Sequence, residues 1–179
     1  PGTEAGLWPV LGKKLGISIC EDSWNDKLFW EKRLYPRDPI EEQVGLGADL
    51  LLDISASPFS LGKPQLRRDM LSALALKHGV PLFYVNLVGG NDELVFDGRS
   101  LVVNDCGEIV AEAKGYEEDL LIVDLERASE KRTAVVPCTI NDTESVFKAL
   151  VIGLRDYVRK CGFKQVVLGL SGGIDSTLT

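Results

Sequence analysis

Two short stretches of this sequence carry residue types that could do chemistry. The first is Cys20-Glu21-Asp22-Ser23-Trp24, which directly follows an apolar run with β-branched residues at positions 15–19. A cysteine on the turn after a buried strand can expose its sulfur as a nucleophile, while the next backbone N–H points toward an oxyanion. The alternative is that Cys20 is a small apolar core residue, which is the commoner situation on composition alone.

The second stretch lies at the other end of the chain and combines glycines, hydroxyls and one acid, in the order Gly169-Leu170-Ser171-Gly172-Gly173-Ile174-Asp175-Ser176. Glycines let backbone amides approach a ligand, and a helix that starts here adds unpaired N–H groups. The pattern predicts a cradle for an anion, without the lysine of the Walker loop. Asp175 suits such a site when a divalent cation bridges it to phosphate oxygens. The alternative is an ordinary glycine-rich turn that caps a helix.

The segments before these motifs alternate between strand and helix patterns. We expect buried strands at residues 15–19, 49–55 and 82–88, the last stopped by Gly89-Gly90, and helices at 40–46 and 65–77, the second with Leu66 on its buried face. Shorter strands are expected at 100–103, 109–113 and 120–123, with a hairpin turn at 104–107. This order predicts an α/β layered domain whose sheet gains antiparallel strands at its end.

The periodicity fades after residue 126, where charges, threonines and a proline take over. We therefore expect one domain over residues 1–126, a linker over 127–140 and the start of a second domain over 141–179. The second domain should open with a helix capped by Asp142 or Thr143, and a strand at 164–170 should lead into the glycine-rich loop. Five apolar residues mark the expected buried stripe of this helix: Phe147, Leu150, Val151, Leu154 and Val158.

Composition and charge limit the kinds of molecule that the protein is expected to bind. The chain has 179 residues, and 20 basic against 27 acidic side chains give a formal net charge of −7. This balance argues against a broad surface for nucleic acid or anionic lipid. No apolar run approaches the roughly 20 residues that cross a bilayer, and no leader pattern precedes the first strand. With four widely spaced cysteines expected as free thiols, we expect a cytoplasmic protein. The absent initiating Met and the stop directly after a motif indicate that both ends are cut.

Both motifs resemble known families. The segment around Cys20 resembles the nucleophile elbow of the nitrilase superfamily, and the terminal loop resembles the pyrophosphate loop of the ATP pyrophosphatase superfamily. Three further stretches agree with the nitrilase pattern in order and spacing: Asp53-Ile54-Ser55-Ala56-Ser57-Pro58-Phe59, then Arg67-Arg68-Asp69, then Asn86-Leu87-Val88-Gly89-Gly90 with Phe96-Asp97-Gly98-Arg99-Ser100. Over its full length the chain resembles the glutamine-dependent NAD synthetase family.

That resemblance implies a fold and a ligase activity. The fold would be the C-terminal part of a nitrilase-like α-β-β-α sandwich, followed by the first helix and strand of a doubly wound α/β nucleotide-binding domain. Cys20 would form a thioester with glutamine and release ammonia. The ammonia would pass to nicotinic acid adenine dinucleotide that ATP has adenylated, which gives NAD, AMP and pyrophosphate. The intact protein would be a homo-oligomer.

The resemblance also assigns roles to single residues. Glu21 would offer its N–H to the oxyanion and its carboxylate to the substrate amine, and Ser57 and Lys63 match the glutamine-holding positions. The eight-residue loop beginning at Gly169 would bind ATP, with Asp175 as the Mg²⁺ contact. The family's glutamate base and catalytic lysine precede the cysteine. Lys13 and Lys14 lie on the approach to the strand that leads to Cys20, where an ammonium cannot easily turn back to the sulfur, so they do not replace that lysine. We therefore expect the 179-residue piece alone to be inactive.

Two other functions stay open at this point. The chain could be a stand-alone amidohydrolase of the nitrilase type, whose tail is a coincidental turn. It could also be a non-catalytic piece of an oligomer interface.

Overall fold

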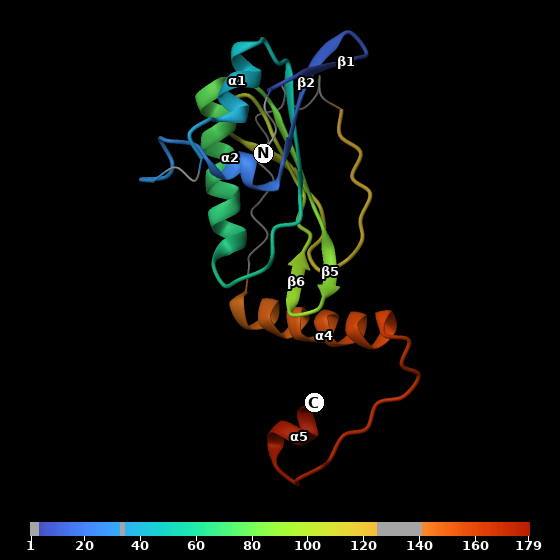
Figure 1. The fold of residues 1–179 in the computed structure, drawn as a ribbon. Helices are drawn as coiled ribbons and strands as arrows, with labels where there is room; N and C mark the ends of the chain where they lie inside the picture. The colour runs from blue at the N-terminus through green and yellow to red at the C-terminus, as the bar shows by residue number, and fades with distance from the viewer. Residues whose placement is uncertain (1–3, 33–34, 125–140) are drawn as a thin grey trace.

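The centre of the molecule is a mixed β-sheet with six strands in the order β1-β2-β3-β4-β7-β8 (Figure 1). The computed structural model describes residues 4–32, 35–124 and 141–179. The sheet strands are β1 (Leu7–Val10), β2 (Lys13–Ile19), β3 (Leu50–Ser55), β4 (Leu82–Asn86), β7 (Leu101–Val103) and β8 (Ile109–Glu112). The strands predicted at 15–19, 49–55, 100–103 and 109–113 are thus confirmed, whereas β1 was not predicted.

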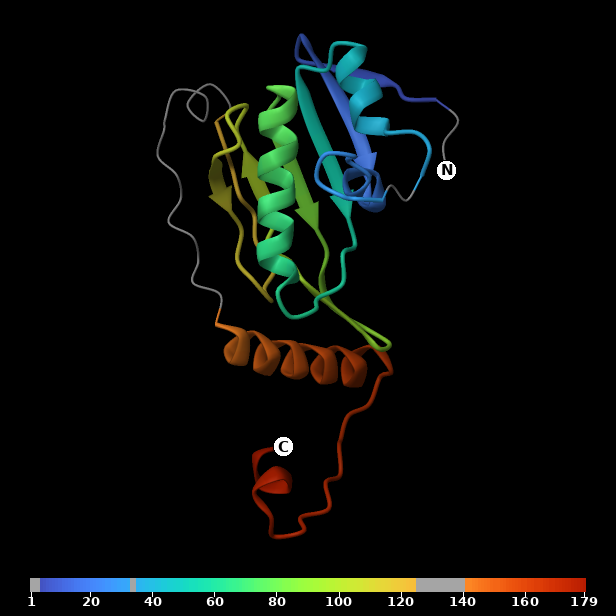
Figure 2. The same cartoon turned by 90° about the vertical axis from the view of Figure 1, so that its left-hand side faces the viewer.

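The three central strands are parallel, and this places their carboxyl ends along one edge. Strand β2 pairs with β3, and β3 pairs with β4, both in parallel register. Parallel neighbours need crossover connections, which here are the helices α1 (Pro39–Gly45) and α2 (Lys63–His78). Both helices cover the same face of the sheet (Figure 2). The predicted helices and their βαβ order are confirmed, and side chains that follow β2, β3 and β4 lie near one another.

The main core lies between α2 and the sheet. From the helix, Met70, Leu71 and Leu74 are at most 3% exposed, and Leu82 of β4 is fully buried against them. Burying each such side chain contributes roughly 1.5–3 kcal/mol. Leu66, predicted on the buried face, is instead 37% exposed near the start of the helix. The sheet and these two helices supply two layers of the predicted α-β-β-α sandwich.

A separate two-stranded ribbon extends from the sheet toward the long helix at residues 142–160. It consists of β5 (Val88–Asn91) and β6 (Leu94–Asp97). The prediction that Gly89 and Gly90 stop the preceding strand was wrong, because they continue into β5 after a break at Leu87. Figure 1 shows helix α4 (Asp142–Lys160) lying across the ribbon. A Cβ built on Gly90 would stand 2.9 Å from Gly153 Cα, so glycine is required for this close approach.

The buried face of α4 differs from the predicted stripe. Phe147, Leu150 and Leu154 are 59%, 68% and 57% exposed, and Ser145, Ala149 and Ile152 are the buried residues. The reason is that α4 contacts a ribbon backbone, which only small side chains allow to come close. Helix α4 is capped by Asn141, which accepts a hydrogen bond from Glu144 N, rather than by Asp142 or Thr143.

Two predicted strands are absent from the described chain. Residues 120–123 have no strand assignment, and residues 164–170 lead as exposed extended chain into helix α5 (Ile174–Leu178). A strand forms only where a neighbour pairs its backbone groups, and no neighbour stands beside residues 164–170 in the described part. The helix predicted to open the second domain is therefore present without the predicted strand, and the predicted linker at 127–140 lies outside the described residues. In residues 4–32, 35–124 and 141–179, no helix is both long and apolar enough to cross a membrane.

Candidate functional site

Cys20 stands on a strained turn at the carboxyl end of β2. It opens the 3₁₀ helix η1 (Cys20–Trp24) with a φ of +49°, a left-handed conformation that typically costs a non-glycine residue about 1–3 kcal/mol. Two hydrogen bonds close the turn. Ile19 N donates to Asp22 Oδ2 at 2.9 Å, and Ser23 Oγ donates to the carbonyl oxygen of Cys20 at 2.9 Å. Cys20 is a free, partly exposed cysteine rather than a core residue.

Lys63 brings a cation to the same end of the sheet. Gly62 takes a φ of +77°, and this left-handed turn starts helix α2 at Lys63. The Lys63 Nζ atom lies 5.2 Å from the centre of the Trp24 ring. Burial and the nearby Arg67 lower the pKa of Lys63, while Cys20 and Asp97 act in the opposite direction. The predicted nucleophile and the predicted carboxylate-binding cation therefore interact electrostatically.

Glu21 points its carboxylate toward a different neighbour. The Tyr35 hydroxyl donates a hydrogen bond to Glu21 Oε2, and this bond raises the pKa of Tyr35. Tyr35 was not predicted as a site residue. Predicting that Tyr35 contacts Glu21 would have required knowing how the chain after Trp24 returns to the Cys20 elbow.

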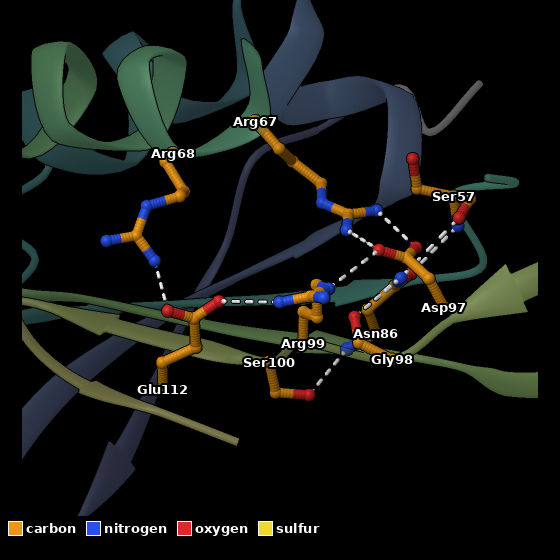
Figure 3. A network of polar contacts seen from close by, with 9 residues as sticks. All are labelled: Ser57, Arg67, Arg68, Asn86, Asp97, Gly98, Arg99, Ser100 and Glu112. Carbon is orange, nitrogen blue, oxygen red and sulfur yellow. Dashed lines mark hydrogen bonds and ion pairs between the residues drawn. The ribbon is translucent and has the colours of Figure 1, made fainter. Parts of the chain in front are cut away.

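Ser57 is held at the carboxyl end of β3 by Asn86, the last residue of β4 (Figure 3). Ser57 is 2% exposed, and its N–H donates to Asn86 Oδ1 at 2.9 Å. Asn86 Nδ2 in turn donates to the carbonyl oxygen of Gly98 at 3.0 Å, and Asn86 N donates to Ser100 Oγ at 3.0 Å. Two of the three predicted stretches of the nitrilase pattern, 53–59 and both parts of the third, thus meet at one asparagine residue.

A buried ion-pair network underlies Lys63. Arg67, one helical turn after Lys63, is 1% exposed and donates to both carboxylate oxygens of Asp97, at 3.0 and 2.6 Å. Arg99 lies 3.8 Å from Asp97 and 3.7 Å from Glu112, and Glu112 also pairs with Arg68 (Figure 3). Sequence reasoning singled out the Arg67 and Asp97 segments without seeing this partnership. Pairs separated by 30 residues leave no local signal.

The glycine-rich loop has a different kind of support. Ser171 Oγ lies 3.0 Å from Ser176 Oγ, and Ser171 N donates to Ser176 Oγ at 3.2 Å. Thr177 Oγ1 donates to the carbonyl oxygen of Gly173 at 2.9 Å. Every one of these groups is exposed, and each bond spans at most five residues. The loop and α5 lie beyond α4, away from the sheet (Figure 1).

The arrangement as a whole can support two chemistries. A partly exposed thiol with a nearby cation and fixed polar groups suits nucleophilic attack on a small polar substrate. The terminal loop, with its glycines and hydroxyls, suits phosphate oxygens. No group of three or more histidine, cysteine or acidic side chains within residues 4–32, 35–124 and 141–179 forms a metal cluster.

Comparison with known families divides the chain in two. Residues 2–134 match the carbon–nitrogen hydrolase family, and residues 146–179 match NAD synthase. The glutamine-dependent NAD(+) synthetase of Synechocystis is 44% identical over 92% of this chain and 30% of that protein. The glutamine-dependent NAD(+) synthetase of Thermotoga maritima is 38% identical over 99% of this chain and 35% of that protein. The chain thus spans about a third of the length of these curated relatives.

Solved structures give the same division. The glutamine-dependent NAD+ synthetase of Acinetobacter baumannii, in complex with ADP, aligns over 99% of this chain and 32% of its own length, with a TM-score of 0.81 and 37% identity. An amidase variant from Nesterenkonia aligns over 75% of this chain and 47% of its own, with a TM-score of 0.58 and 28% identity. That amidase carries the acetamide moiety of fluoroacetamide covalently on its active-site cysteine.

Proposed function

The chain belongs to the carbon–nitrogen hydrolase family, and from that membership we propose that it is part of a glutamine-dependent NAD synthetase, a ligase. The observation that carries the proposal is the strained, partly exposed Cys20 elbow with Lys63 beside it, in one chain with an NAD synthase segment. Residues 1–126 would belong to the glutamine-hydrolysing domain, 127–140 to the linker and 141–179 to the start of the ATP-using domain.

In the first reaction, Cys20 attacks the side-chain amide carbon of glutamine. The amide nitrogen leaves as ammonia, and water then hydrolyses the thioester to glutamate. The Glu21 N–H stabilises the oxyanion, because it follows the nucleophile on the turn. Lys63 pairs with the α-carboxylate of glutamine, Glu21 with its α-amino group, and Ser57 completes the pocket. The substrate ammonium would have to compete with Tyr35 for the Glu21 carboxylate.

The proton on the nucleophile needs a base. The resemblance assigns this task to a glutamate, with a lysine beside it, at positions that precede the nucleophile in the sequence. Lys13 and Lys14 lie on β2 itself and are exposed, and Lys14 N is bound to Asp49 Oδ2 at 2.7 Å. They therefore do not take this role, and the 179 residues alone are expected to lack both activities.

In the second reaction, ammonia attacks adenylated nicotinic acid adenine dinucleotide and yields NAD and AMP, after ATP has released pyrophosphate. The loop from Gly169 to Ser176 would hold the phosphates through backbone amides and the hydroxyls of Ser171 and Ser176. Asp175 fits one Mg²⁺ ligand, because Mg²⁺ beside a nucleotide usually takes one or two carboxylates together with phosphate oxygens and water. The ion would neutralise phosphate charge as pyrophosphate leaves.

The proposal extends to the binding partners, cellular location and oligomeric state of the intact protein. The substrates are small molecules, and the net charge of −7 does not favour nucleic acid or an anionic membrane as a partner. The intact protein would work in the cytoplasm as a homo-oligomer.

The test is Cys20→Ala in the full-length protein. Glutamine-driven NAD formation should vanish, while added ammonium still supports NAD formation, because the second site needs only the free amine. Cys106→Ala, which alters an exposed cysteine in the β7–β8 turn, should keep both activities. Loss of both activities in Cys20→Ala would contradict the division of labour between the two sites.

A stand-alone amidase is the second candidate, because the amidase from Nesterenkonia shares the fold with 28% identity. It predicts amide hydrolysis that is independent of ATP and tolerates deletion of residues 141–179. Dependence of glutamine turnover on ATP and the dinucleotide would contradict it.

A further inference from the structure

A buried acid without a cation lies directly behind the Cys20 elbow. Asp53 in the middle of β3 is 1% exposed, and no lysine or arginine among the described residues forms an ion pair with it. Burying an unpaired carboxylate costs several kcal/mol. Burial accordingly raises the pKa of Asp53, against the opposing effect of nearby hydroxyls. Such a residue needs a reason beyond filling space.

The hydroxyls around Asp53 come from both sides of the nucleophile. Ser18 faces Asp53 in the parallel register of β2 and β3, and its Oγ donates to Asp53 Oδ2 at 2.8 Å. Ser55 donates to Asp53 Oδ1. Ser23 is 1% exposed and lies close enough to Asp53 to lower the pKa of that carboxyl, while its single hydroxyl proton is donated to the carbonyl oxygen of Cys20 at 2.9 Å. Ser18 precedes the nucleophile by two residues and Ser23 follows it by three.

The elbow needs such support because its conformation is unfavourable. A non-glycine residue at a φ of +49° persists only where its surroundings fix it. Asp53 belongs to a central strand of the sheet, accepts a hydrogen bond from Ser18 before Cys20 and lies close to Ser23 after it. It is therefore well placed to hold the turn in the geometry that aims the sulfur.

We propose that Asp53 is a positioning residue for the Cys20 nucleophile, acting through Ser18 and Ser23. This inference rests on the proposed role of Cys20 and adds a residue to it. Asp53 touches no substrate in this scheme, so it should affect the reactivity of the thiol more than the binding of glutamine by Ser57 and Lys63.

The test is Asp53→Asn in the full-length protein, with the isosteric Asp26→Asn as its matched control. Asp26 is another buried acid, 4% exposed, but it pairs with Lys77 at the far end of α2. Asparagine keeps the size of Asp53 yet replaces one acceptor oxygen with a donor, so one serine hydroxyl must turn away. We expect kcat for glutamine hydrolysis to fall about 10- to 100-fold, with KM changed less than about threefold.

The decisive readout is the rate at which iodoacetamide alkylates Cys20, because it reports the thiol without needing glutamine. It should fall in Asp53→Asn and stay at the wild-type value in Asp26→Asn, although both variants lose stability. Unchanged alkylation and kcat in Asp53→Asn would overturn the proposal, and so would an equal fall in both variants.

Two further measurements keep the result unambiguous. Should Asp53→Asn fail to fold, Ser18→Ala must slow alkylation of Cys20 in a folded protein, and a wild-type rate would overturn the proposal. If the wild-type protein hydrolyses no glutamine, the proposed function fails. The alkylation rates still decide whether Asp53 positions the thiol.

Discussion

The two ends of this chain organise their polar groups in opposite ways. Around Cys20 and Lys63 the supporting contacts join distant parts of the sequence: Ser18 and Asp53 are 35 residues apart, and Arg67 and Asp97 are 30 apart. Around the glycine-rich loop the hydrogen bonds span at most five residues and are exposed. The first site therefore depends on the folded sheet, whereas the loop takes its shape from its own sequence.

Removing Arg67 should give the largest effect. Arg67→Ala leaves the fully buried Asp97 without its bidentate partner, and breaking a buried pair in this way typically costs about 3–5 kcal/mol. The urea midpoint of unfolding should fall accordingly. The control is Lys148→Ala, which breaks the exposed pair with Glu144 on α4 and should cost less than about 1 kcal/mol. Similar losses in the two variants would contradict the expectation that buried long-range contacts stabilise the fold more than exposed local ones.

The second-largest effect is expected from a substitution at the contact between the β5–β6 ribbon and α4. In Gly90→Ala the new Cβ would lie 2.9 Å from Gly153 Cα, and such overpacking typically costs about 1–3 kcal/mol. Amide hydrogen exchange over residues 142–160 should become faster because α4 is pushed from the ribbon. Gly169→Ala has open space around its Cβ and should leave the exchange unchanged. Unaltered exchange in Gly90→Ala would show that the helix is not seated on this backbone.

A smaller difference is expected in how acid affects stability through the buried pair of Asp26 with Lys77 and through the exposed pair of Glu144 with Lys148. Burial acts to raise the pKa of Asp26, but its hydrogen bonds, first that from Lys77, outweigh this effect and hold the pKa below the ordinary 3.8. This carboxylate therefore stabilises the fold above pH 3.8, and the contribution is lost as the pH falls through the lower folded value. Lys77→Met removes the partner, so the acid midpoint of unfolding should move to higher pH. Lys148→Met beside the exposed Glu144 should leave the midpoint in place, and a shift there as large as in Lys77→Met would contradict the comparison.

The smallest effect on stability is expected in the loop. Ser171→Ala removes contacts to Ser176 and Gly173, all exposed, and should change the free energy of unfolding by no more than about 0.5 kcal/mol. If the loop binds nucleotide as proposed, the same variant should weaken ATP binding in the full-length protein, measured by calorimetry. A large loss of stability would mean that the loop has partners elsewhere in the protein.

Sequence reasoning succeeded where local pattern decides structure. The apolar runs and glycine stops located β2, β3, α1 and α2, and the position of Cys20 after a strand predicted its exposed turn. The hydrogen bonds of the glycine-rich loop are also local, but its predicted role in binding ATP stays a prediction.

Sequence patterns failed to predict the structure where contacts with a distant segment determine it. The apolar stripe of α4 predicted the wrong buried face, because the ribbon backbone selects Ala149 and Gly153 over Phe147 and Leu150. Residues 164–170 have strand propensity but no strand beside them in the described chain. The sequence also contained no sign that Ser18 meets Asp53, because the two residues are brought together only by the register of β2 and β3.

The spacing of Lys63 and Arg67 has a consequence for selectivity. A single turn of α2 separates them, and the buried pair with Asp97 fixes the Arg67 end of that turn to the body of the protein. If Lys63 binds the α-carboxylate while Cys20 attacks the amide carbon, as proposed, the separation between the Lys63 ammonium and the Cys20 sulfur would select for substrate length. On the proposed function, asparagine, one methylene shorter than glutamine, could not reach both at once and should be a poor substrate.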